Sequence, residues 1–141
     1  MYKLIVKSKF SSAHKLREYH GKCEELHGHN WNIEAVVCAQ ETNNIGLVID
    51  FKILKEKLNK VLDMLDHKYL NDIEYFSAKC ETSPQSGGTK NNPSSENIAK
   101  YIYDNLKKEL SGCKLQEIRV WETDTSCAVY SESRPAGEAD E

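Results

Sequence analysis

The sequence predicts an α+β domain in which a four-stranded antiparallel sheet carries two helices on one face. Three observations lead to this prediction: two strand-like segments come first, two amphipathic helical segments follow, and two further strand-like segments close the chain. In this ββααββ order, the helices cover one face of the sheet. The other face is left to solvent or to a second subunit, so we expect oligomerisation.

The first two strands are indicated by alternation along the chain. Residues 2–10 and residues 31–39 alternate with a period of two, which is typical of half-buried strands. Residues 15–26 are polar and contain Gly21, which favours a loop between the two strands. Residues 43–46, with the sequence Asn-Asn-Ile-Gly, indicate a turn after the second strand.

The two helices are indicated by apolar residues at helical spacing. The first is predicted over about residues 51–65, with Asp50 as its N-cap. The second is predicted to begin after Ser94, its N-cap, and to end at Gly112. Residues 77–92, which lie between them, have the composition of a loop.

Two closing strands complete the predicted sheet. Ile118 and Val120 belong to one, residues 128–130 to the other, and a turn over residues 123–126 joins them. The polar tail that follows is predicted to be disordered. We therefore expect one domain over residues 1–132 and a disordered tail over residues 133–141.

The composition narrows the classes of partner. The 141 residues include 19 basic and 22 acidic side chains, and the net charge is −3. No basic stripe is visible, which argues against a nucleic acid partner but not against a phosphorylated small molecule. The five cysteines are scattered without a C-x-x-C pair, which indicates free thiols in a reducing compartment. Without a signal peptide or a membrane-length apolar run, we expect a cytoplasmic protein.

The most informative stretch is His27-Gly28-His29, at the start of the second strand. Residues two apart on a strand share a face, so the two imidazoles should lie side by side, as zinc ligands do. His14 follows the first strand, and hairpin pairing would bring it close as a third ligand. The alternatives are half-exposed strand histidines at 27 and 29 and a loop histidine at 14. His20 has no such pairing argument.

Four further residues carry reactive groups. Cys23, four residues before His27, is either a fourth ligand or a thiolate near the metal. Asp66 beside His67 could fix the tautomer of the imidazole, or the histidine could simply interact with the helix dipole. Glu122 falls on the apolar face of a strand and needs a partner there, unless it turns to water.

These residues belong to motifs that span almost the whole chain. The motifs are Phe10-x-x-Ala13-His14, Cys23-x-x-x-His27-Gly28-His29, Val48-Ile49-Asp50-Phe51, Leu65-Asp66-His67, Pro93-Ser94-Ser95-Glu96-Asn97 and Trp121-Glu122-Thr123. With them, the chain from Lys3 to about Glu132 resembles the 6-pyruvoyl-tetrahydropterin synthase superfamily. The spacing between Cys23 and His27 is most similar to the bacterial 6-carboxytetrahydropterin synthase branch.

The resemblance implies a tunnelling fold, in which three subunits join their sheets into a barrel and two such rings stack into a hexamer. It also implies that the Zn²⁺ ligands are His14, His27 and His29 and that Cys23 is the catalytic thiol. Asp66 and His67 are implied to be an acid–base pair, and Glu122 to anchor the pterin ring.

The implied substrate is 7,8-dihydroneopterin triphosphate. The carboxy branch cleaves its side chain and releases acetaldehyde and triphosphate, on the way to the queuosine base. The rivals are the 6-pyruvoyl branch, a branch that forms 6-hydroxymethyl-dihydropterin with a glutamate, and a non-catalytic zinc- or pterin-binding module. In this chain Glu24 and Glu25 follow Cys23, so a glutamate is also available near the proposed thiol. The chain departs from the family pattern in two places: the segment over residues 77–92 is longer, and Ser94 stands where threonine is more usual.

Overall fold

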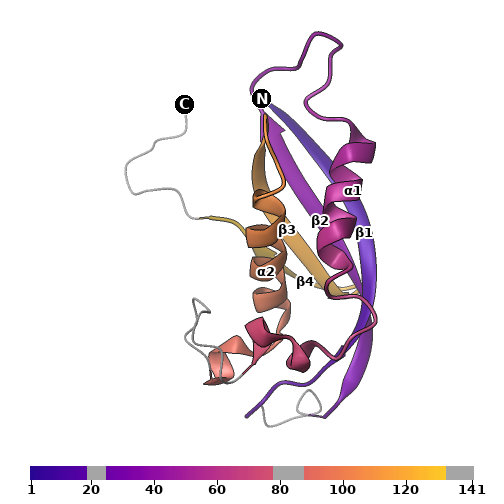
Figure 1. Ribbon diagram of the computed structural model, residues 1–141, viewed down its shortest axis with the longest axis vertical. Helices are drawn as coiled ribbons and strands as arrows, with labels where there is room; N and C mark the ends of the chain where they lie inside the picture. Colours follow the sequence, from indigo (N-terminus) through magenta and orange to yellow (C-terminus); the bar gives the residue numbers. More distant parts are fainter. Residues whose placement is uncertain (19–24, 78–87, 133–141) are drawn as a thin grey trace.

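The computed structural model describes residues 1–18, 25–77 and 88–132. Its strands and helices are, in chain order, β1 (Tyr2–His14), β2 (His27–Ala39), α1 (Phe51–Leu62), α2 (Ser95–Lys107), β3 (Lys114–Thr123) and β4 (Ser126–Tyr130). Short 3-10 turns are η2 (Leu70–Asp72), η3 (Glu74–Phe76) and η4 (Gly88–Asn91). The sheet has the order β1-β2-β3-β4, and each neighbouring pair is antiparallel. Both helices cover one face (Figure 1), which confirms the predicted α+β architecture.

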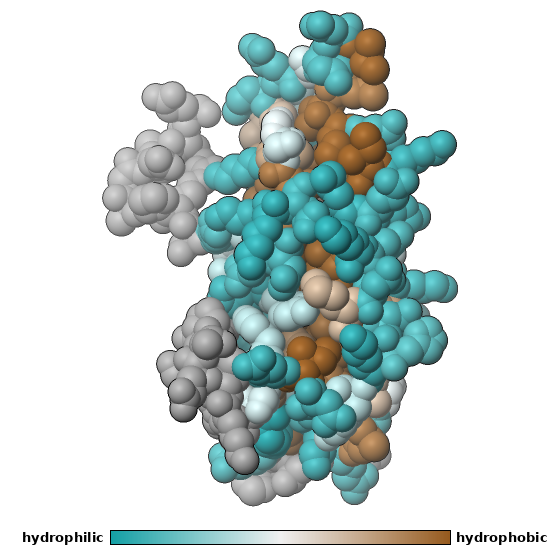
Figure 2. Space-filling model, in the orientation of Figure 1, coloured by the Kyte–Doolittle hydropathy of each residue, from teal (hydrophilic) through white to brown (hydrophobic). Residues whose placement is uncertain are grey.

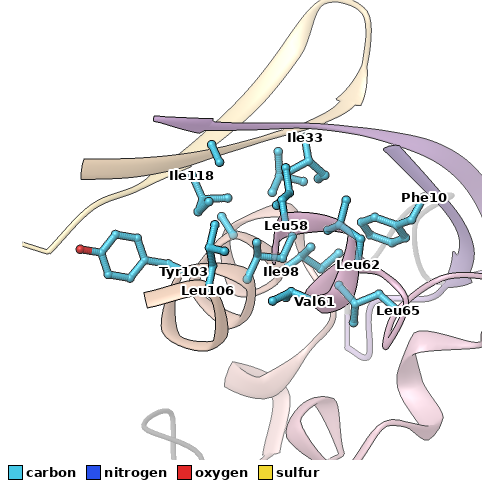
Figure 3. Packing of buried hydrophobic residues seen from close by; sticks show 14 of the residues in the cluster. Phe10, Ile33, Leu58, Val61, Leu62, Leu65, Ile98, Tyr103, Leu106 and Ile118 are labelled. Atoms are coloured by element: carbon cyan, nitrogen blue, oxygen red, sulfur yellow. The ribbon is translucent and has the colours of Figure 1, made fainter. Parts of the chain in front are cut away.

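The core lies between the helices and the sheet (Figure 3). Leu54 and Leu58 from α1 and Ile98 and Ile102 from α2 are fully buried there. The remaining helix surface is mostly hydrophilic, with hydrophobic atoms gathered near the start of α1 (Figure 2). No helix in the described ranges is both long and apolar enough to span a membrane.

Both predicted helix caps are confirmed. The side chain of Asp50 accepts a hydrogen bond from the Lys52 amide, and that of Ser94 accepts one from the Asn97 amide. The first helix is shorter than predicted, because α1 ends at Leu62. The apolar spacing continues to Leu65 because this residue is also buried, although it lies in the turn that follows the helix.

β1 is longer than predicted and includes His14, which the sequence pattern placed just beyond the strand. The extension is held from both sides. On one side the register pairs Ser12 with His29 and His14 with His27. On the other side the chain after α1 covers the strand, since His67 donates from its backbone to the carbonyl of Ser11 and Ala13 donates to that of Lys68. His14 is therefore fixed by backbone pairing.

Candidate metal centre

Three histidines converge at the end of the β1–β2 hairpin. His14 pairs directly with His27 in the strand register, and His29 lies two residues further on the same face. The Nε2 atoms of His14 and His27 are 2.9 Å apart. The three histidines and Glu122 offer one ligand atom each, and these four atoms all lie within 4.8 Å of one another. We call these four residues the His/Glu cluster.

Glu122 reaches the cluster from the end of β3. The β3–β4 ladder shifts register between Trp121 and Thr123, and such irregularities re-aim a side chain next to a site. The Oε1 atom of Glu122 lies 2.8 Å from Nε2 of His29, 3.4 Å from that of His14 and 4.0 Å from that of His27. Its Oε2 atom accepts a hydrogen bond of 3.2 Å from the Ser95 hydroxyl, in the first turn of α2.

The tautomers of two histidines are set by backbone carbonyls. Nδ1 of His14 is 2.7 Å from the Pro93 carbonyl oxygen, and Nδ1 of His27 is 2.8 Å from that of Glu25. A carbonyl only accepts hydrogen bonds, so each Nδ1 carries the proton and each Nε2 of a neutral ring presents a lone pair to the cluster. Such contacts to the second ring nitrogen are the usual way to orient metal-binding histidines.

Burial favours the neutral form of two of the rings, those of His14 and His29. It lowers the pKa of His14, against the opposing effect of the hydrogen bond to the Pro93 carbonyl. It also lowers the pKa of His29, against the opposing charge of Glu122. Nε2 of His29 is buried close to the carboxylate but is not oriented as a hydrogen-bond partner.

The cluster fits a bound cation. Unprotonated nitrogens of His14 and His27 and a carboxylate oxygen face one another at short range, and such acceptors repel unless a positive charge lies between them. Three imidazole nitrogens and one carboxylate oxygen are a donor set that suits Zn²⁺. Trp31 forms a rigid wall behind the rings, because it is fully buried and its ring centre lies 4.9 Å from that of His14 and 5.0 Å from that of His29.

A cavity of about 280 Å³ opens beside the cluster. It is lined by His14 and Glu122 of the cluster and by Leu16, Ser94, Ser95, Glu96, Ser126, Cys127 and Ala128. A small cavity with several polar groups in its lining is typical of a site for a small molecule.

Asp66 and His67 form a pair at a different place. Oδ2 of Asp66 lies 2.9 Å from Nδ1 of His67, and its Oδ1 accepts a hydrogen bond of 2.9 Å from the Ser11 amide. That amide, followed by the smaller effect of His67, lowers the pKa of Asp66. The His67 side chain is 84% exposed, and its backbone is left-handed, with φ of 54°. In the described chain the pair belongs neither to the His/Glu cluster nor to the lining of the cavity.

Other residues of interest were not foreseen or fall outside the described ranges. Cys23, Glu24 and His20 lie outside the described residues. The contacts of Ser95 and the wall formed by Trp31 were missed. Trp31 could have been found, because it follows His29 by two residues and so continues the same strand face. The carbonyl of Pro93 gives no signal in a sequence, because every residue carries one.

Comparison with known proteins identifies the family. The family model described as 6-pyruvoyl tetrahydropterin synthase matches residues 3–133. The chain belongs to this family. One relative is the 6-carboxy-5,6,7,8-tetrahydropterin synthase of Haemophilus influenzae, which is 30% identical over 142 residues, with 94% of this chain and all of the relative covered. Another is the dihydroneopterin monophosphate aldolase of Pyrococcus furiosus, which is 34% identical over 123 residues, covering 85% of this chain and 89% of the relative.

A solved structure agrees with this pterin synthase family assignment. The 6-pyruvoyl tetrahydropterin synthase of Caenorhabditis elegans superposes with a TM-score of 0.75 at 26% identity, and the match covers 94% of this chain and 96% of that one. The predicted family and the predicted α+β fold of the single chain are therefore confirmed.

Proposed function

We propose that this protein is a zinc-dependent 6-carboxy-5,6,7,8-tetrahydropterin synthase. It would convert 7,8-dihydroneopterin triphosphate and one water into 6-carboxytetrahydropterin, acetaldehyde and triphosphate, in the cytoplasm and on the way to the queuosine base. The observation that carries the proposal is the convergence of three histidine nitrogens and one carboxylate beside a small cavity. The Haemophilus influenzae relative supports this branch of the family.

In this proposal the cluster binds both metal and substrate. His14, His27 and His29 hold Zn²⁺ through Nε2, and the carbonyls of Pro93 and Glu25 keep two of the rings in the correct tautomer. Bound zinc supplies Lewis acidity beside the substrate side chain. The Glu122 carboxylate, which borders the cavity, accepts hydrogen bonds from the N–H groups at the edge of the pterin ring.

Proton transfer is assigned to Cys23, Asp66 and His67. The Cys23 thiolate removes a proton from the substrate side chain, and His67 exchanges the second proton. Asp66 holds Nδ1 of His67, which leaves Nε2 as the atom that gives or takes a proton. Because this pair is exposed and does not line the cavity of its own chain, we place it at a site that a neighbouring subunit completes.

The test of the proposed reaction is the identity of the product. The zinc-loaded protein is incubated with 7,8-dihydroneopterin triphosphate, and the products are identified by mass spectrometry. We expect 6-carboxytetrahydropterin and acetaldehyde. A 6-hydroxymethyl or 6-pyruvoyl product would move the protein to another branch of the family. The second candidate function is an aldolase, because the chain is 34% identical to the dihydroneopterin monophosphate aldolase of Pyrococcus furiosus. Zinc binding without any turnover would indicate a binding module.

We also expect a closed homo-oligomer, with a hexamer favoured by the family resemblance. β1 and β4 are the two edges of the sheet, and each exposes an apolar side chain, with Ile5 45% and Val129 55% exposed. Open strand edges invite pairing with another chain. Light scattering at micromolar concentration measures the assembly directly, and a stable monomer would contradict this expectation.

A further inference from the structure

We propose that Glu122 is an exchangeable fourth ligand of the metal, and that a pterin entering the cavity draws it away. This inference rests on the proposed function, because it uses the same metal and the same cavity. It assigns two successive partners to one carboxylate: the metal before the ligand binds, and the pterin ring afterwards.

The first argument is the position of the carboxylate oxygen. Oε1 of Glu122 lies between 2.8 and 4.0 Å from the three Nε2 atoms of His14, His27 and His29. Four ligands around a tetrahedral Zn²⁺ stand about 3.4 Å from one another, given metal–ligand bonds of about 2.0–2.1 Å. The observed distances scatter around that value. A carboxylate that served only as a pterin anchor would have no reason to lie so close to all three rings.

The second argument is the absence of a proton on Nε2 of two of the three rings. Two of the rings keep their proton on Nδ1, where the carbonyls of Pro93 and Glu25 accept it. Nε2 of His29 is buried, and the nearby Oε1 is not oriented as its hydrogen-bond partner. At His14 and His27 the carboxylate therefore meets lone pairs and not N–H groups. This arrangement is favourable only when a cation is shared between them.

The third argument is the way in which Glu122 is held. Its Oε2 is bonded to the hydroxyl of Ser95, which lines the cavity at the start of α2. Its backbone lies at the irregular step of the β3–β4 ladder, outside the paired positions. A rotation of the side chain can therefore move Oε1 from the histidines toward the cavity without any change in the sheet. The metal then gains an open coordination position only when a ligand is present.

The experiment compares Glu122→Gln with wild type in metal binding and not only in activity. Zn²⁺ affinity is measured by competition with a chromophoric chelator, and the visible absorption of the Co²⁺-loaded protein reports the coordination. We expect Glu122→Gln to weaken Zn²⁺ binding at least 10-fold and to change the Co²⁺ spectrum. Asp124→Asn is the matched control, because it removes an acidic group from the same hairpin outside the cluster, and it should leave both unchanged.

A second measurement needs no variant. Unsubstituted pterin, which has no side chain to contact the metal, is added to the Co²⁺-loaded wild-type protein. We expect its spectrum to move toward that of Glu122→Gln. An unchanged wild-type spectrum at saturating pterin, or a Glu122→Gln protein with wild-type affinity and spectrum, would overturn the inference and leave the proposed function intact. A wild-type protein that binds neither Zn²⁺ nor Co²⁺ would overturn both.

Discussion

His29→Ala is expected to remove the metal and abolish turnover, with little effect on the fold. His14 and His27 would then be the only imidazole ligands, and two histidines do not hold a catalytic zinc well. The fold should survive, because the His29 side chain lies at one end of the sheet and outside the hydrophobic core. Elemental analysis of zinc, combined with circular dichroism, measures both effects.

The same result is expected for His27→Ala, and His67→Ala is the matched control for zinc content. His67 lies outside the His/Glu cluster, so its removal should leave the metal in place. If both His27→Ala and His29→Ala retained a full equivalent of zinc, the cluster would not be the metal centre.

Cys23→Ala should keep its zinc but lose about 10²- to 10⁴-fold in turnover, which is the usual effect of losing a general acid or base. A thiol near a cation loses its proton at neutral pH, and the resulting thiolate is a stronger base than a carboxylate. Glu24→Gln and Glu25→Gln are the matched changes, and both should leave carboxytetrahydropterin formation nearly intact. Turnover and zinc content are measured on the same preparations.

Two results would reverse the assignment of Cys23. Loss of zinc in Cys23→Ala would make the thiol a fourth ligand and the site structural. Formation of 6-hydroxymethyl-dihydropterin by Cys23→Ala, together with its loss in Glu25→Gln, would make a carboxylate the base. Glu25 is the better carboxylate candidate, because it follows Cys23 by two residues. In an extended segment, side chains two residues apart are expected to point to the same side.

Local periodicity accounts for most of what the sequence could predict. Alternation and helical spacing located the strands and helices, and the pairing of neighbouring strands was enough to bring His14 to His27. Contacts between segments that are distant in the sequence could not be predicted from local periodicity. Nδ1 of His14 is held by the carbonyl of Pro93, 79 residues away, and β1 is extended by the chain that follows α1. Such contacts depend on tertiary packing, which no local pattern encodes.

The Asp66–His67 pair illustrates the same limit. Adjacent residues often point apart, so the sequence left open whether these two side chains meet. They meet because His67 adopts a left-handed backbone conformation, with its amide bonded to the carbonyl of Ser11. The amide of Ser11 in turn fixes the Asp66 carboxylate. A bend imposed by a strand more than 50 residues away is not visible in the local sequence.

The His/Glu cluster takes its ligands from the β1–β2 hairpin and from the end of β3, so it exists only after both parts of the sheet have assembled. An unfolded chain cannot offer these four atoms to one ion. A metal that binds only the folded state adds about 2.7 kcal/mol to the free energy of unfolding when its free concentration is 100 times its Kd. The supply of zinc would thus change the stability margin of a protein that folds without it, as well as how much of the protein is active.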